Sequence, residues 1–419
     1  MSKVSCGIDF GTTNSAVSIA KHSSTPEVVP LEGNNLTIPT AIFFEEDTNN
    51  VFYGSNALKN YIDGSRGRFM RSMKRILGSN LMNVGTKINN KSVKFDFVLS
   101  KFLKNIKEKS DQYAKENIEN VVLGRPVHFR DNDPQGDAQA QEELKNIAKS
   151  VGYKNIEFQY EPIAAAFAHE TKILGEELAC VVDIGGGTSD ISIIKLGQKL
   201  QNKTNRTDDI LANTGVRIGG NDFDKNLSLK SFMPHFGIGT TYGSKNLPVP
   251  SYLFSGLSEW SNINNEYNYK NLNMVNSILQ QSNSKELYGR LYELLEKETA
   301  HTLLNMVEIT KMELTDKEDT VVLLKFMDNP FSVISNRKDF EDSIHQNVNK
   351  ICLSVKECIS MAKIKKEDID LLILTGGSTE IPYIQKHIKS YFSNAKLSQE
   401  NKLASVGLGL AFDAKRKFL

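Results

Sequence analysis

The sequence predicts an α/β fold in which two related lobes grip one ligand. Two stretches share one pattern, GIDFGTTNSAVSI at residues 7–19 and VVDIGGGTSDISI at residues 181–193. Each joins an apolar run, an aspartate, a Gly/Thr-rich turn and a second apolar run, which is typical of a β-hairpin. Strands and helical periods alternate around these stretches, as in a mixed sheet with helices on its faces.

The two turns have the composition of phosphate-binding loops. Their cores are Asp9-Phe10-Gly11-Thr12-Thr13 and Asp183-Ile184-Gly185-Gly186-Gly187-Thr188. Glycines let backbone N–H groups approach an anion, threonines add hydroxyl donors, and the aspartates can face a hydrated Mg²⁺. Each turn alone could be an ordinary Asp-Gly hairpin. The repetition favours two lobes that hold one polyphosphate from opposite sides.

Periodicity predicts the remaining elements in chain order. The first half contains a hairpin over 1–20, strands within 27–44, helix and loop over 53–77, a helix over 95–116, a strand over 120–129, a helix over 137–151, a strand over 156–160 and an Ala-rich helix over 163–170. Glu161-Pro162 opens that last helix, where proline is tolerated in the first turn.

The second half begins near residue 178. It contains a hairpin, a polar loop over 198–209, a turn opening a helix over 214–224, a long helix over 286–314, strands over 321–331, a helix over 338–361, a strand over 370–375, and helices over 382–392 and 405–415. Residues 237–285 are rich in Asn, Ser, Tyr and Gly and contain the only tryptophan, Trp260. We therefore expect lobe I at 1–177, lobe II at 178–404 with an insertion at 237–285, and a C-terminal helix at 405–419 that returns to lobe I.

Composition narrows the class of protein. The 419 residues are 24% charged and 39% hydrophobic, with a formal net charge of +1. This balance gives no electrostatic reason to expect nucleic acid or a membrane surface as a partner. An early first strand leaves no room for a signal peptide. None of the four cysteines forms a CxxC pair or has metal-ligand spacing with histidine, so we expect reduced thiols in a cytoplasmic protein. We also expect a monomer.

Four motifs in order carry a resemblance to a known family. IDFGTTNSAV, VVDIGGGTSDISI, YEPIAAAFAHE and LTGGSTEIP are similar to the two phosphate motifs, the connecting motif and the adenosine motif of DnaK-type heat-shock chaperones. The resemblance runs from about residue 3 to the C-terminus, apart from 237–285, and is closest to the short, lidless DnaK-like proteins of bacteria. It implies a two-lobed actin-like ATPase fold, with duplicated ribonuclease-H-like lobes around a central nucleotide cleft.

The resemblance also implies ATP or ADP and Mg²⁺ as ligands, with roles for particular residues. The β- and γ-phosphates would contact Gly11, Thr12, Thr13, Asn14, Gly185, Gly186, Gly187 and Thr188. Asp9 and Asp183 would orient Mg²⁺ through water, and Glu161 and Asp190 would complete that polar shell. Lys74, in MKRILG, would be the catalytic lysine beside the γ-phosphate and the attacking water. The catalytic set is then Lys74, Glu161, Asp183, Thr188 and Asp9.

The same resemblance implies which residues would contact the nucleoside. The ribose-side turn is Gly219, Gly220 and Asn221; Glu308 and Lys311 would contact the adenosine, and Gly376, Gly377 and Ser378 would pack against base and sugar. The family stacks adenine between two arginines, whereas this sequence has Met312 and Glu380. Methionine can still pack against a ring, but glutamate cannot stack equivalently, so we expect weaker or less selective nucleotide binding.

Three of these residues, Lys74, Glu308 and Lys311, also have a plainer interpretation. The run 66–75 could be a solvated basic helix face, as charge runs usually are. The spacing of its motif favours the phosphate role for Lys74, but its arginines fit the plain interpretation. Glu308 and Lys311 are three residues apart, so they share a helix face and could form a surface salt bridge.

Two further departures concern regulation. Pro126 matches a proline that acts as an allosteric switch in the family, but the arginine that usually works with it has no counterpart at 139–141. The sequence also reaches Leu419 without an interdomain linker, a β-rich peptide-binding domain or a lid. We therefore do not expect this chain alone to clamp unfolded clients.

Three functions remain open from the sequence. The first is an ATP-binding, slowly hydrolysing DnaK-like protein whose lobe closure controls a protein partner or co-chaperone, through 237–285 for example. The second is a small-molecule kinase of the same fold, although no kinase-specific motif is present. The third is a nucleotide-sensing scaffold with negligible turnover, which Met312 and Glu380 make plausible.

Overall fold

The computed structural model describes residues 4–46, 48–89, 91–201, 203, 205–392, 394–398 and 404–419. Parts of the expected first hairpin and of the expected loop at 198–209 therefore lie outside the described residues. The chain forms two compact units. Unit 1 is Met1–Gly219, Lys350–Glu380 and Ile384–Leu419, and unit 2 is Gly220–Asn349 with Ile381–Tyr383. The lobe boundaries expected from the sequence differ from this division and stay a prediction.

Unit 1 contains two sheets with the same strand topology. In the first sheet β1 (Val4–Asp9) pairs antiparallel with β2 (Asn14–Lys21) and parallel with β10 (Asn120–Arg125). In the second sheet β12 (Glu176–Ile184) pairs antiparallel with β13 (Ser189–Gly197) and parallel with β19 (Leu371–Thr375).

The outer strands of the two sheets also correspond. The first sheet continues with β3 (Glu27–Val28) antiparallel to β2, and with β11 (Asn155–Tyr160) parallel to β10. The second continues with β14 (Ile210–Val216) antiparallel to β13, and with β20 (Lys396–Leu397) parallel to β19. Five strands thus correspond in order and direction, which shows that the hairpin repeat in the sequence reflects a repeat of structure.

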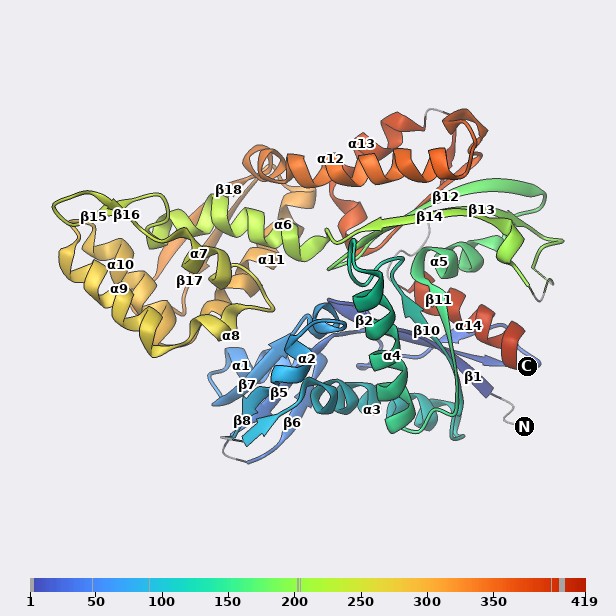
Figure 1. Ribbon diagram of the computed structural model, residues 1–419, viewed down its shortest axis with the longest axis horizontal. Coiled ribbons are helices and arrows are strands. Elements are labelled where there is room, and N and C mark those ends of the chain that lie inside the picture. The colour runs from blue at the N-terminus through green and yellow to red at the C-terminus, as the bar shows by residue number, and fades with distance from the viewer. Residues whose placement is uncertain are drawn as a thin grey trace. The chain divides into compact units, whose positions relative to one another are not determined.

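Two helices pack between these sheets (Figure 1). Helix α14 (Ser405–Phe418) packs against β1, β2 and β10, whereas α5 (Glu161–Glu170) packs against α14, β12 and β13. Small residues permit this close packing, since a Cβ at Gly409 would overlap the carbonyl oxygen of Ala164. Buried aliphatic side chains from both sheets complete this core.

The rest of unit 1 covers and extends the first sheet. Helices α3 (Phe95–Ala114) and α4 (Pro134–Ser150) contribute to a second core with the inner strands. The other elements are short: β4 (Thr37–Pro39), β5 (Ala41–Glu45), β6 (Val51–Tyr53), α1 (Gly54–Ile62), β7 (Gly67–Arg71), a 3₁₀ turn (Met73–Ile76), α2 (Leu81–Val84), β8 (Thr86–Ile88) and β9 (Lys91–Val93).

Unit 2 is mainly helical. Its elements are α6 (Gly220–Leu227), a π-helical and a 3₁₀ turn (Ser228–Phe232, Met233–Phe236), β15 (Thr241–Tyr242), β16 (Leu247–Pro248), α7 (Ser251–Leu257), α8 (Ile263–Glu266), α9 (Tyr269–Gln281), α10 (Lys285–Glu296), α11 (Ala300–Asp316), β17 (Asp319–Leu324) and β18 (Phe331–Asn336). Helix α12 (Arg337–Met361) leads back to unit 1, where α13 (Pro382–Tyr391) follows β19.

The expectation of one long helix over 286–314 is wrong. The structure has α10 and α11 instead, with a break at residues 297–299. Glu298 has φ +54°, a left-handed conformation that an α-helix of L-residues does not accommodate. Apolar periodicity continues on both sides of such a break and therefore does not reveal it.

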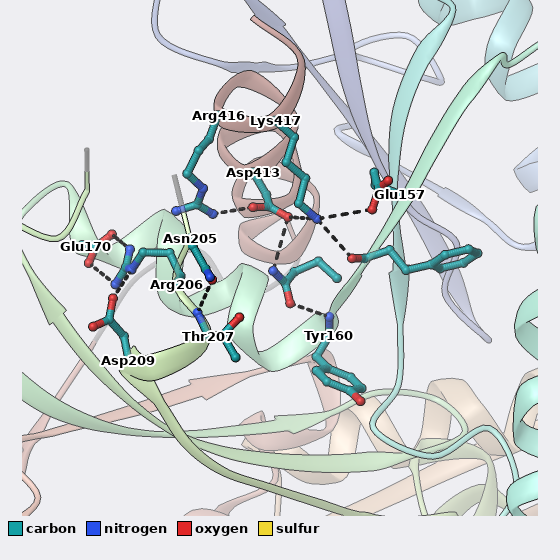
Figure 2. Close-up of polar contacts among 12 residues, drawn as sticks. Glu157, Tyr160, Glu170, Asn205, Arg206, Thr207, Asp209, Asp413, Arg416 and Lys417 are labelled. Atoms are coloured by element: carbon teal, nitrogen blue, oxygen red, sulfur yellow. Dashed lines mark hydrogen bonds and ion pairs between the residues drawn. The ribbon is translucent and has the colours of Figure 1, made fainter. Parts of the chain in front are cut away.

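A buried ion cluster attaches the β13–β14 connection to α5 (Figure 2). The Arg206 guanidinium donates to both carboxylate oxygens of Glu170 at 2.8 Å and to Asp209 at 2.6 Å. Arg206 is 5% exposed and Glu170 is 3% exposed. The guanidinium also lies 5.0 Å from the Phe167 ring centroid. This cluster supports one edge of the α5–α14 layer.

Candidate functional site

The two hairpin turns lie against one another in unit 1. A Cβ at Gly186 would overlap the Thr13 Oγ1 atom, and one at Gly187 would lie 2.7 Å from Thr12 Oγ1. Only glycine permits this approach, because any side chain at Gly186 would displace the first turn. The structure therefore brings backbone N–H groups and threonine hydroxyls from both copies of the repeat to one place.

Two later glycine segments border the second turn. A Cβ at Gly219 would lie 2.6 Å from the Gly187 nitrogen, and one at Gly376 would lie 2.8 Å from Asp183 Oδ1. The Ser378 hydroxyl donates to the Gly185 carbonyl at 3.5 Å. Gly377 begins the short 3₁₀ helix Gly377–Glu380 beside them. Three segments far apart in sequence, namely the first turn, Gly219 and Gly376–Ser378, thus converge on residues 185–187.

A buried lysine lies among four carboxylates beside the turns. Lys74 is 7% exposed and donates a hydrogen bond to Glu161 within an ion pair. Its 3₁₀ turn follows Ser72, whose φ of +59° redirects the chain after β7. Glu161 is the first residue of α5, where the helix dipole favours a negative charge.

The other three carboxylates come from the hairpins. Asp9 ends β1, and Asp183 pairs in register with Asp190 across β12 and β13. The Asp190 carboxylate accepts from the Val127 N–H at 2.6 Å and from the Thr188 hydroxyl. The first-sheet position matching Asp190 is Ala16, opposite Asp9. The two copies of the hairpin therefore differ at this point.

Burial and mutual repulsion shift the protonation of these groups. Burial, reinforced by Glu161, raises the pKa of Asp190 to about 7 and that of Asp9 to about 7. Burial, Glu161 and Asp190 raise the pKa of Asp183 well above its usual range. Burial alone would lower the pKa of Lys74, but the nearby charges of Glu161 and Asp9 outweigh it and raise that pKa. The site thus keeps a cation, Lys74, beside two carboxylates, Asp9 and Asp190, whose pKa values are raised to about 7.

These shifts predict the pH dependence of stability. Asp190 is only 2% exposed, whereas Asp9 keeps some exposure, so Asp190 is the clearer case. Because its pKa rises from 3.8 to about 7 on folding, the folded chain binds a proton that the unfolded chain releases between these values. The free energy of unfolding should therefore fall as pH rises through this window, and Asp190→Asn should flatten the fall. Urea unfolding of the ligand-free protein between about pH 5 and pH 8 measures this slope.

The exposed aspartate Asp208 offers a matched control for that measurement. Asp208→Asn should leave the slope of the wild-type protein unchanged. Equal slopes for Asp190→Asn and the wild type would contradict the assignment of a neutral-range proton to Asp190.

The donor set fits a hydrated divalent cation. When ionised, the four carboxylates outnumber the single ammonium, and Mg²⁺ prefers oxygen ligands while keeping several waters. Within the described ranges, no three His, Cys, Asp or Glu side chains are arranged to hold a metal directly. The role of Asp9 and Asp183 in holding the waters of Mg²⁺ stays a prediction.

The nucleoside-side candidates Gly220, Asn221, Glu308, Lys311 and Met312 belong to unit 2. The Lys311 ammonium lies 2.6 Å from Asp224 Oδ1 and donates to the Gly220 carbonyl at 3.3 Å. Lys311 is 9% exposed, so the pair is buried rather than a surface salt bridge, whereas Met312 is 64% exposed. The roles proposed for these residues toward a nucleotide stay predictions.

The sequence model of a family described as "Hsp70 protein" matches residues 5–241 and 276–415. The chain belongs to the Hsp70 family. This assignment and the duplicated sheets confirm the recognised resemblance and the predicted fold class. The unmatched residues 242–275 lie inside the 237–285 segment that stood apart in the sequence.

The Hsp70-family relatives are bacterial chaperones. Chaperone protein DnaK of Thermosipho africanus is 28% identical over 416 residues, which cover 97% of this chain and 58% of that protein. Chaperone protein DnaK of Mycoplasmopsis agalactiae is 27% identical over 419 residues, which cover 98% and 58%. The chain therefore spans 58% of the length of these curated relatives. In the described part of this Hsp70-family chain, no helix is long and apolar enough to cross a bilayer.

The structure adds three residues that sequence reasoning missed. Asp224 pairs with Lys311, and Val127 binds Asp190. Arg75, which was left to the solvated-face interpretation, lies against the second turn, since a Cβ at Gly187 would be 3.3 Å from its Cγ. The MKRILG motif could have suggested Arg75, but nothing local marks the other two.

Arg125 also contacts Pro126, the proline that follows β10, and the sequence did not suggest an arginine at this position. The Nε of Arg125 donates to the Pro126 carbonyl at 3.1 Å, and its Nη1 donates to Gln141. The same guanidinium pairs with Asp137 at 2.6 Å. Within residues 139–141, Gln141 thus supplies an amide that binds Arg125, and the arginine comes from position 125.

Proposed function

We propose that this Hsp70-family chain binds Mg·ATP at the two turns of unit 1 and hydrolyses it slowly. The observation that carries the proposal is the contact of Thr13 with Gly186, next to the Lys74–Glu161 pair. Such an arrangement supplies what phosphoryl transfer to water requires, namely donors that position the phosphates and a cation close by.

Backbone and side-chain groups of the two turns have separate roles in this proposal. The N–H groups and hydroxyls of Gly11–Asn14 and Gly185–Thr188 bind and orient the β- and γ-phosphates. Lys74 stabilises charge that develops on the γ-phosphoryl oxygens, and Glu161 holds the ammonium in place. Asp9 and Asp183 hold the waters of Mg²⁺, which supplies neutralising charge to the phosphates when bound.

The output of nucleotide binding is a contact with a protein partner, such as a client or co-chaperone. Family membership supports this proposal, and the unmatched segment 242–275 is a distinctive surface through which a partner could be selected.

Calorimetric titration and phosphate release test the proposal together. Purified protein should bind Mg·ATP and release phosphate slowly without any added substrate. Asp9→Asn combined with Asp183→Asn should remove the Mg²⁺ dependence of binding, while the exposed-site control Asp208→Asn should not. Rapid turnover that requires a sugar or another hydroxyl compound would establish the kinase alternative. Binding without turnover would establish the nucleotide-sensing scaffold, and no binding would overturn nucleotide function altogether.

Restoring the two arginines should strengthen adenine binding. Met312 and Glu380 are both exposed, so each can be replaced without disturbing a core. Guanidinium stacking at an exposed site contributes about 0.5–1 kcal/mol, so the two substitutions Met312→Arg and Glu380→Arg together should lower the Kd for ADP by roughly 5- to 30-fold. The Kd for inorganic triphosphate should barely change, since it has no ring to stack. A parallel gain for both ligands would indicate a general charge effect and contradict stacking.

A further inference from the structure

One buried carboxylate in unit 2 joins the nucleoside-side lysine to the 237–285 segment. Asp224, on α6, is fully buried, and its Oδ1 atom lies 2.6 Å from the Lys311 ammonium. Its Oδ2 atom accepts from the Trp260 Nε1–H at 3.4 Å. The two carboxylate oxygens of Asp224 thus contact two different segments, α11 through Lys311 and residues 237–285 through Trp260.

The lysine is held in a defined orientation. An ammonium has three donors, and here Asp224 and the Gly220 carbonyl are its oxygen partners among the described residues. Two fixed partners leave the third N–H with a set direction. Gly220 is the first residue of α6, so Lys311 binds the start of the helix that carries Asp224.

Trp260 is also buried and contacts α11. Trp260 is 2% exposed and its ring centroid lies 6.1 Å from that of His301, which is on α11 with Lys311. Tyr267, from the same segment, accepts from the Ala300 N–H at 2.9 Å through its hydroxyl. The 237–285 segment therefore contacts the start of α11 directly and Lys311 through Asp224.

We propose that Asp224 is a positioning residue for Lys311 and that it couples Lys311 to Trp260. A change in the hydrogen bonds of Lys311 alters the charge felt by Asp224, and the Trp260 indole responds because it shares that carboxylate. Since Lys311 is proposed to contact the nucleotide, the effect on nucleotide affinity rests on the proposed function. The Lys311–Asp224–Trp260 coupling itself does not.

The sole tryptophan makes the coupling measurable without a ligand. Lys311→Met should shift the emission of Trp260 in the ligand-free protein, because both side chains contact the Asp224 carboxylate. Met312→Leu, at the adjacent exposed position, should leave the emission unchanged. The double variant Asp224→Asn/Lys311→Met removes both charges and gives a folded reference if the single variant unfolds. Unchanged emission in a folded Lys311→Met protein would overturn the coupling.

Mg·ADP then tests the positioning role. Its binding should change Trp260 emission, with a midpoint equal to the calorimetric Kd. Asp224→Asn should weaken binding roughly 10-fold through the misplaced ammonium, abolish the emission response and leave kcat at saturation unchanged. Lys225→Gln is the matched control, because Lys225 binds Glu259 at 3.0 Å between the same two segments without touching Lys311. Wild-type affinity in Asp224→Asn would overturn the positioning role, whereas failure of the wild-type protein to bind Mg·ADP would refute the proposed function and leave the ligand-free result to decide the coupling.

Discussion

Replacing Lys74 with alanine is expected to slow phosphate release from Mg·ATP by roughly 100- to 1,000-fold. The reason is that Lys74 is the buried cation of the site, paired with Glu161 and surrounded by three aspartates. In the proposed function its charge would stabilise the transition state more than the bound substrate, because negative charge on the transferring phosphoryl group redistributes during the reaction. Single-turnover hydrolysis measures the chemical step free of product release.

Two controls separate this effect from loss of structure. Lys104→Ala removes a lysine that is paired with Glu108 but exposed, and should leave the rate unchanged. The double variant Lys74→Ala/Glu161→Gln avoids leaving a buried carboxylate without its cation, and should be as slow as the single variant while unfolding less readily. If Lys74→Ala turned over at the wild-type rate while binding Mg·ATP normally, the catalytic assignment would be wrong.

Replacing Arg206 with methionine is expected to lower the free energy of unfolding by about 3–5 kcal/mol. Arg206 satisfies two buried carboxylates at once, Glu170 and Asp209, and its removal leaves both without their main cation. The lost stacking on Phe167 adds to the effect. Urea denaturation followed by circular dichroism measures the change.

The neighbouring lysine gives the comparison for Arg206. Lys203 pairs with the same Asp209 at 2.9 Å but is 47% exposed, so Lys203→Met should change stability by less than about 1 kcal/mol. Replacing the whole cluster, as in Arg206→Met/Glu170→Leu/Asp209→Leu, should recover much of the lost stability, because no unpaired charge remains. Equal losses for Arg206→Met and Lys203→Met would show that the cluster is not electrostatically buried.

Much of the fold could be predicted because its signals are local. Alternation of apolar residues marked both hairpins, and Glu161-Pro162 marked the start of α5. The repeated Asp-Gly-Thr pattern even predicted duplication, which appears as matched strand order in two sheets. The break between α10 and α11 escaped prediction because it depends on one left-handed residue, Glu298, rather than on periodicity.

The candidate site shows the same division. The phosphate-binding character of the turns was recognisable from their glycines and threonines, because these residues together let backbone N–H groups approach an anion and add hydroxyl donors. The pairing of Lys74 with Glu161 joins residues 87 positions apart, and Asp224 meets Lys311 across a similar distance in sequence. No local pattern encodes such pairs, because each member is compatible with many environments until the chain has folded.

The sequence by itself determined which backbone could approach an anion and which segments would form strands and helices, because both depend on the steric character of nearby residues. The tertiary structure alone decided which charges became buried together, and thereby the raised pKa of Asp190 and the orientation of Lys74 and Lys311. The physical reason is that electrostatic interactions gain their strength from exclusion of water, and only packing of distant segments excludes it.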